Sequence, residues 1–166
     1  MSTQANLQAA FAGESQANRK YLAFAAKAVA EGYPQIAKLF SAAAAAETVH
    51  AHAHLRVMNG VGDTKNNLRA AIEGEGYEFR EMYPAFIKEA EAEGNRAALA
   101  TFRNANAVEK THYDLYSKAL ETLQAGKDLA PTAIYVCDIC GHTVEGAAPD
   151  KCPVCGAPKN RFQEVA

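Results

Sequence analysis

The chain has 166 residues, of which 49% are hydrophobic, enough for one well-buried core and a small additional domain. Its formal net charge is −2, so no basic surface suits a nucleic acid or an anionic membrane. The N-terminal sequence MSTQANLQAAFAGESQ has no basic start and no long apolar run, so we expect neither a signal peptide nor a membrane span, and a cytoplasmic location.

Four long helices are predicted before the cysteine-rich end of the chain. Apolar residues recur at helical spacing, and Gly32 followed by Pro34 is typical of one helix ending and the next beginning. Two tightly joined helix pairs indicate a four-helix bundle. The expected helices cover residues 3–31, 34–58, 65–93 and 95–124.

The C-terminal tail differs in composition from the helices. Residues 127–132 (KDLAPT) are an expected linker, and the residues after them are rich in Gly, Pro and Cys. A segment this small cannot hold a core without a metal. The expected fold is therefore mainly α, with a four-helix bundle over residues 1–130 and a small metal-ribbon domain over residues 131–166.

The two helix pairs resemble each other in sequence. LQAAFAGE (7–14) matches LRAAIEGE (68–75) at five of eight positions with an offset of 61. YLAFAAKAVAEG (21–32) matches YPAFIKEAEAEG (83–94) at seven of twelve with an offset of 62. We interpret this as one supersecondary unit used twice. The change of offset places one extra residue near 76–82, which a helix most simply absorbs as a π-bulge.

Metal-ligating residue types are part of this repeat. Glu47 and His50 are separated by three positions and share one helix face, and the later helix repeats the same spacing. Carboxylates bridge and neutralise two divalent ions, and neutral imidazole fills a terminal position on each. One such glutamate is usually solvated surface, but two pairs at the repeat offset indicate a dinuclear site. The candidate ligands are Glu14, Glu47, His50, Glu75, Glu78, Glu109 and His112.

The four cysteines form two Cys-x-x-Cys pairs, which favours metal ligation over disulfides. Four sulfur ligands imply zinc or a single iron ion, and the spacing does not separate the two metals. A redox-active dinuclear site needs an electron entry point, which favours iron, although zinc can occupy the site in recombinant protein. The ligands are Cys137, Cys140, Cys152 and Cys155.

These motifs resemble the rubrerythrin family, in which a ferritin-like di-iron four-helix bundle is fused to a rubredoxin-like domain. The most specific stretch is Gly74-Glu-Gly-Tyr-Glu78 followed by Glu81-Met-Tyr-Pro84. The resemblance implies a peroxidase that reduces hydrogen peroxide to water, protecting against oxidative stress. Electrons would pass through the four-cysteine iron from an external donor, either rubredoxin or an NAD(P)H-dependent reductase.

The resemblance also implies roles for single residues around two iron ions. One iron would move between His50 in the reduced state and Glu78 in the oxidised state. Tyr21 would hydrogen-bond near the metal site, with Tyr83 as the weaker candidate. The remaining implied roles are terminal ligation by Glu14 and His112, bridging by Glu47 and Glu109, and completion of the set by Glu75.

The quaternary structure and the reaction leave alternatives open. After His112 the last helix continues for about a dozen residues, or roughly 18 Å, so the tail is expected to leave its own dinuclear site. We therefore expect a head-to-tail homodimer in which each four-cysteine site serves the partner's di-iron site. Whether the first two helices are exchanged between protomers stays open. The alternative functions are a ferroxidase or iron-handling protein that uses O₂, and a non-catalytic metal-binding protein with a zinc ribbon.

Overall fold

The computed structural model describes residues 2–165, so Met1 and Ala166, the outer limits of the two expected domains, lie outside the described residues. The chain forms two compact units, one ending at Gly62 and the other beginning at Asp63. Between residues 2 and 165, no helix combines the length and the apolar character that a membrane span requires.

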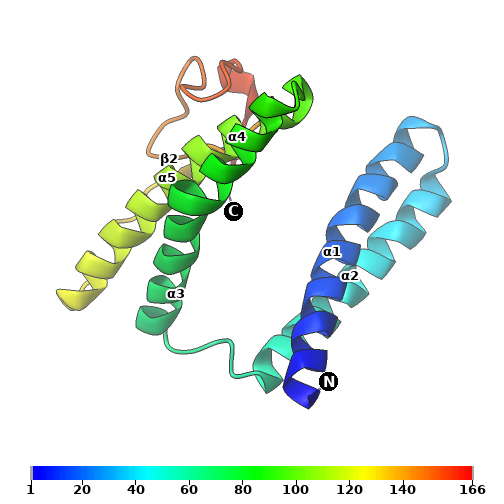
Figure 1. Ribbon diagram of the computed structural model, residues 1–166, viewed down its shortest axis with the longest axis horizontal. Helices are drawn as coiled ribbons and strands as arrows, with labels where there is room; N and C mark the ends of the chain where they lie inside the picture. The colour runs from blue at the N-terminus through cyan, green and yellow to red at the C-terminus, as the bar shows by residue number, and fades with distance from the viewer. Residues whose placement is uncertain (1, 166) are drawn as a thin grey trace. The chain divides into compact units, whose positions relative to one another are not determined.

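The first unit is a hairpin of two long helices, α1 (Thr3–Ala30) and α2 (Pro34–Val57) (Figure 1). The turn between them closes when the Tyr33 N–H donates to the Ala28 carbonyl at 2.8 Å, with Gly32 at φ 81°. Glycine tolerates this left-handed conformation, and the following proline begins α2. Small side chains let the helices approach closely, and those that are buried are Ala25, Ala28, Ala37, Ala44 and Ala51.

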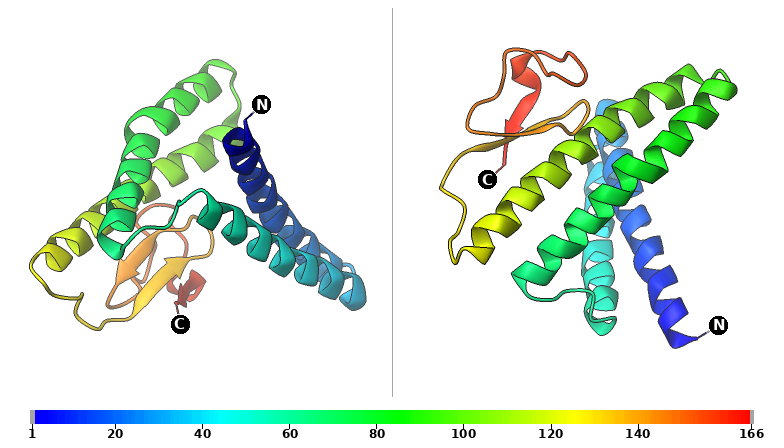
Figure 2. Two further views of the ribbon diagram at one scale, coloured as in Figure 1. Left: turned by 90° about the horizontal axis from the view of Figure 1, so that it is seen from below. Right: turned by 60° about the vertical axis from the view of Figure 1, so that its left-hand side comes forward.

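The second unit contains a second hairpin, in which α5 packs against three consecutive helical segments (Figures 1 and 2). Its turn repeats the first one, because Gly94 has φ 69° and the Asn95 N–H donates to the Ala90 carbonyl at 2.9 Å. The predicted helix boundaries are confirmed to within two residues. The segments are α3 (Thr64–Tyr77), η1 (Glu78–Met82), α4 (Tyr83–Ala92) and α5 (Arg96–Gln124).

The five-residue segment η1 is a π-helix, which confirms the bulge predicted from the change of offset. The Tyr83 N–H donates to the carbonyl of Glu78, five residues earlier, instead of four as in an α-helix. The extra residue is thus accommodated without breaking the helix.

The duplication is also visible in the side-chain packing near each turn. Each hairpin holds a trio of aromatic rings with nearly the same spacing. The centroid separations are 6.2, 6.2 and 5.5 Å in the first unit and 6.2, 6.2 and 5.6 Å in the second. The trios are Tyr21, Phe24 and Phe40, and Tyr83, Phe86 and Phe102.

The residues after the linker form a small antiparallel sheet with strand order β2-β1-β3 (Figure 2). Its buried centre consists of Cys137, Cys152 and Phe162, too little apolar area to stabilise a domain without a bound metal. The expected fold, mainly α with a small cysteine domain, is confirmed. The elements are β1 (Ile134–Cys137), β2 (Thr143–Glu145), the 3₁₀ turn η2 (Lys159–Arg161) and β3 (Phe162–Glu164).

Candidate metal centres

Three of the predicted ligands converge between α1 and α2. The His50 Nδ1 atom lies 3.0 Å from Glu47 Oε2 and 3.9 Å from Glu14 Oε1. The ligand atoms of all three lie within 4.8 Å of one another, close enough for a single metal ion. One turn beyond Glu14, the Asn18 side-chain amide donates to Thr48 Oγ1 at 2.8 Å and fixes the two helices in register.

A second group with nearly the same geometry lies between α3 and α5. The His112 Nδ1 atom lies 2.9 Å from Glu109 Oε2 and 3.7 Å from Glu75 Oε1, and these ligand atoms also lie within 4.8 Å of one another. The His112 side chain is 27% exposed, against 55% for His50. The two groups thus match in geometry, but the second is more enclosed.

The carboxyl groups within each of these two groups interact electrostatically. Burial, together with the charges of Glu109 and Glu78, raises the pKa of Glu75 from 4.5 to about 7. In the first unit, a hydrogen bond between the two carboxyls raises the pKa of Glu14 and lowers that of Glu47. Bound divalent ions would remove this repulsion, so the donor set fits a metal.

Glu78 occupies the first position of the π-helix, beside this second group. Burial and the Glu109 charge raise its pKa, but its carboxylate is not among the three tightly grouped ligands. Tyr83 also lies near these acids, because burial and then the charges of Glu109, Glu78 and Glu75 raise its pKa. The ring contacts of Tyr21, the candidate preferred from the sequence, are with Phe24 and Phe40. Tyr83 is equivalent to Tyr21 in the repeat, and both remain candidates for a hydrogen bond near the metal site.

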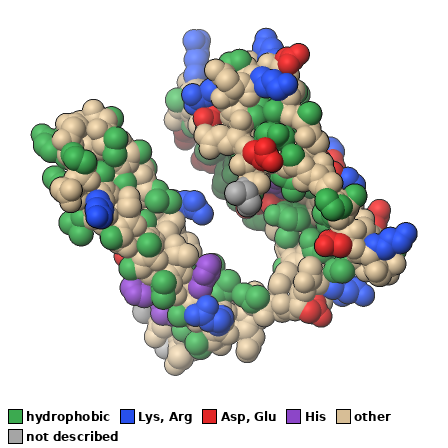
Figure 3. All heavy atoms as spheres, turned by 180° about the vertical axis from the view of Figure 1, so that it is seen from behind, with side chains coloured by type: hydrophobic (Ala, Val, Ile, Leu, Met, Phe, Trp, Pro, Cys, Tyr) green, Lys and Arg blue, Asp and Glu red, His purple; other side chains and the backbone are tan. Residues whose placement is uncertain are grey.

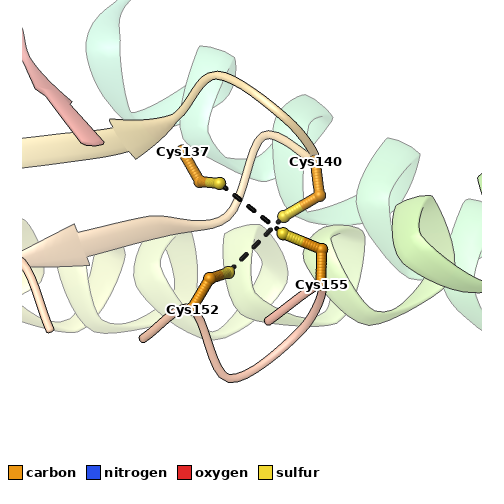
Figure 4. A group of neighbouring side chains, drawn as sticks. All are labelled: Cys137, Cys140, Cys152 and Cys155. Atoms are coloured by element: carbon orange, nitrogen blue, oxygen red, sulfur yellow. Dashed lines mark hydrogen bonds between the residues drawn. The ribbon is translucent and has the colours of Figure 1, made fainter. Parts of the chain in front are cut away.

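The four cysteine side chains converge from two loops (Figure 4). The Sγ atoms of Cys137 and Cys155 are 3.7 Å apart, as are those of Cys140 and Cys152. Sulfur ligands about 2.3 Å from a tetrahedral ion are separated by about 3.8 Å, whereas a disulfide requires about 2.05 Å. The spacing therefore fits one tetrahedral metal ion.

Each cysteine loop is closed by a glycine in a left-handed conformation. The Gly141 N–H donates to the Cys137 carbonyl at 2.8 Å, and the Gly156 N–H donates to the Cys152 carbonyl at 2.9 Å. Burial alone would raise the pKa of the Cys152 thiol, but backbone N–H groups that point at its sulfur lower it to about 7. A thiolate ligand is thus available at neutral pH.

The cysteine domain lies against α5 of its own chain. The His112 Nε2 atom is 3.0 Å from Thr143 Oγ1, and Lys118 forms an ion pair with Glu145 at the other end of β2. The sequence-based expectation that the tail leaves its own chain's site is therefore wrong. The chain reverses at Gly126 (φ 73°) and returns along α5, a path that helix length alone does not reveal.

These features define a helical protein with duplicated carboxylate–histidine metal-binding groups and a separate four-cysteine site. Residues 5–120 match the rubrerythrin family, and residues 135–163 match the rubredoxin-like domain of rubrerythrin. The chain belongs to the rubrerythrin family. This assignment confirms the ferritin-like four-helix bundle with a rubredoxin-like tail.

Proteins similar to the chain cover almost its full length. Nigerythrin from Nitratidesulfovibrio vulgaris is 39% identical over 97% of this chain and 85% of its own length. Rubrerythrin-1 from Clostridium acetobutylicum is 37% identical over 97% of this chain and 93% of its own length. A solved structure of partially reduced nigerythrin covers 99% of this chain and 87% of its own, with a TM-score of 0.59 and 36% identity.

Proposed function

We propose that the chain is a non-haem di-iron peroxidase that reduces hydrogen peroxide to water and so protects against oxidative stress. The observation that supports this best is the presence, on one chain, of two matched Glu-Glu-His groups and a four-cysteine site. Nigerythrin has been solved in partially reduced and all-ferrous states, which supports iron as the metal here. The proposed division between bundle and electron-transfer domain falls at residues 130 and 131.

The donor chemistry supports redox-active iron over a permanent structural ion. Structural zinc sites in proteins are mostly closed sets of cysteine and histidine, whereas mixed carboxylate and imidazole groups with open positions suit iron and oxygen chemistry. Two iron ions held by these residues would supply the two electrons that, with two protons, convert one hydrogen peroxide into two waters.

In this proposal, the side chains of the protein bind the two metal ions and supply protons to the substrate. Glu47 and Glu109 are the proposed bridging carboxylates, and His50 and His112 present Nδ1 to the metal positions. In the proposal, Glu78 holds a proton beside Glu109 and releases it toward a peroxide oxygen, a role supported by the burial that raises its pKa. In the proposal, Glu78 also exchanges with His50 as a ligand between oxidation states, and Tyr21 and Tyr83 hydrogen-bond near the site.

Electrons would enter at the four-cysteine site from rubredoxin or from an NAD(P)H-dependent reductase. The cysteines must stay reduced to bind the ion, so we expect the protein to work in a reducing compartment such as the cytoplasm.

We further propose a homodimer in which each di-iron site has two half-sites from different chains, one made of Glu14, Glu47 and His50 and the other of Glu75, Glu109 and His112. A ferritin-like bundle has a long crossover between its second and third helices. Glu47 lies ten residues before the end of α2 and Glu75 eleven residues after the start of α3, so the crossover must span about 30 Å along the axis. The seven peptide steps from Val57 to Thr64 reach at most about 25 Å. This shortfall supports exchange of the α1–α2 hairpin.

The surface of the hairpin supports the same arrangement. Hydrophobic side chains lie exposed along it (Figure 3). Burying them against another chain would stabilise the assembly by about 25 cal/mol per Å². Those between 44% and 69% exposed include Leu22, Phe24, Val29, Ile36, Leu39 and Val49.

Rapid mixing, metal analysis and sedimentation test the proposal. The fully reduced protein should be oxidised faster by hydrogen peroxide than by O₂ in single-turnover mixing; faster oxidation by O₂ would support a ferroxidase. Zinc at all sites in protein from its native cell would support the non-catalytic alternative.

For assembly, sedimentation of the iron-loaded protein should give a dimer, and about fifteen flexible residues inserted after Gly60 should permit a loaded monomer. A loaded monomer of the unmodified chain would contradict hairpin exchange.

A further inference from the structure

The two ring nitrogens of His112 have different partners. Nδ1 faces Glu109 and Glu75, while Nε2 lies 3.0 Å from the Thr143 hydroxyl. That hydroxyl also lies 3.1 Å from the Gly141 carbonyl oxygen, which can only accept. The single hydroxyl hydrogen therefore goes to Gly141, and Thr143 accepts the Nε2–H of His112. This fixes the tautomer that leaves the Nδ1 lone pair for a metal.

We propose that Thr143 is a positioning residue that couples the four-cysteine site to the His112 half-site within one chain. Gly141 directly follows Cys140, so two hydrogen bonds and two residues of backbone connect that sulfur to the imidazole ring. The inference rests on the proposed function. If iron is held at both places, one electron would pass from a ferrous ion held by the cysteines, leaving it ferric, to a ferric ion held by His112, making it ferrous. Both bridging hydrogens stay on their atoms, so no proton crosses.

The two hydrogen bonds that link His112, Thr143 and Gly141, called the bridge below, are held in place by their surroundings. Val108, which is only 3% exposed, packs beside Gly141, where an added Cβ would lie 3.7 Å from the valine Cγ1. The ion pair between Lys118 and Glu145 fixes the other end of β2. The bridge thus joins α5 to β2 through two residues 31 positions apart in the sequence, and one of them, His112, is the proposed metal ligand.

The two half-sites differ at this point. The contacts of His50 are with Glu47 and Glu14, and its side chain is twice as exposed as that of His112. The bridge therefore directs electrons into the half-site formed by α3 and α5. The other histidine keeps the freedom that the proposed ligand exchange requires.

Thr143→Val removes the hydroxyl with little change of shape, and Thr143→Ser retains it. After the reduced iron protein is mixed with peroxide, we expect reoxidation of the four-cysteine iron to slow about 10- to 100-fold in Thr143→Val, with recovery in Thr143→Ser. Metal content and the visible spectrum should not change. Thr132→Val, in the exposed linker, is the matched control. Transfer at the wild-type rate in Thr143→Val would overturn the proposal.

A second measurement does not depend on activity. In the zinc-loaded protein, NMR should show a slowly exchanging His112 Nε2–H that is lost in Thr143→Val, so absence of this signal in the wild type would overturn the bridge even if the chain is no peroxidase. Mixed dimers of Cys140→Ser and His112→Ala chains test the path within one chain. They should show no transfer, because neither chain holds both sites, and recovered transfer would show that the electron crosses between chains.

Discussion

Glu75 is expected to destabilise the metal-free protein at neutral and alkaline pH. Its pKa is about 7 in the folded chain against 4.5 as the ordinary value, so the folded state holds the proton more tightly. The cost of ionising it grows as pH rises from about 4.5 to about 7 and is complete above that. At 1.36 kcal/mol per pKa unit the upper limit is about 3 kcal/mol, and solvent screening reduces this to about 1–2 kcal/mol.

Glu75→Gln should therefore stabilise the metal-free chain at pH 8, raising its melting temperature by roughly 3–6 °C, and should change it much less at pH 5. Thermal unfolding followed by circular dichroism in chelator measures both. Glu73→Gln on the exposed face of α3 is the control and should have little effect at either pH. Equal stabilisation at the two pH values, or destabilisation at pH 8, would refute the electrostatic reasoning. With metal present the same variant should bind more weakly, because it has lost a ligand.

Other substitutions test the remaining parts of the site. Glu78→Ala should slow peroxide turnover at least about tenfold while iron content stays near that of the wild type, as rapid mixing and metal analysis would show; loss of both ions would make it a structural ligand. Cys155→Ser should unfold the tail but leave the helices intact, so limited proteolysis should remove residues after the linker; an intact, protected tail would contradict the need for metal. Gly141→Ala should destabilise the metal-loaded tail by about 1–2 kcal/mol, because φ 85° is strained for alanine, and melting temperatures would reveal a failure of this expectation.

The helices and the metal-binding groups could be predicted because they depend on local spacing. Residues three positions apart share a helix face, so Glu47 and His50 had to lie together once the helix formed. The π-helix could be predicted for a similar reason, since a change of offset between two repeats leaves one residue to accommodate.

The path of the tail could not be predicted, because it depends on contacts between distant residues. Nothing in the sequence near Thr143 indicates that its hydroxyl meets His112, and helix length alone pointed the wrong way. The environment of Tyr83 could not be predicted either, because it depends on carboxylates from α3, η1 and α5.

The π-helix also affects how the site can move. A π-turn contains one residue more than an α-helical turn. Its hydrogen bonds between residues five positions apart can therefore shift to neighbouring residues while both ends of the helix stay fixed. Such a local register change would displace Glu78 without moving α5 or disturbing the aromatic trio around Tyr83. The proposed exchange of a ligand at the metal site would then require only a local shift within one helix, while the rest of the protein keeps its structure.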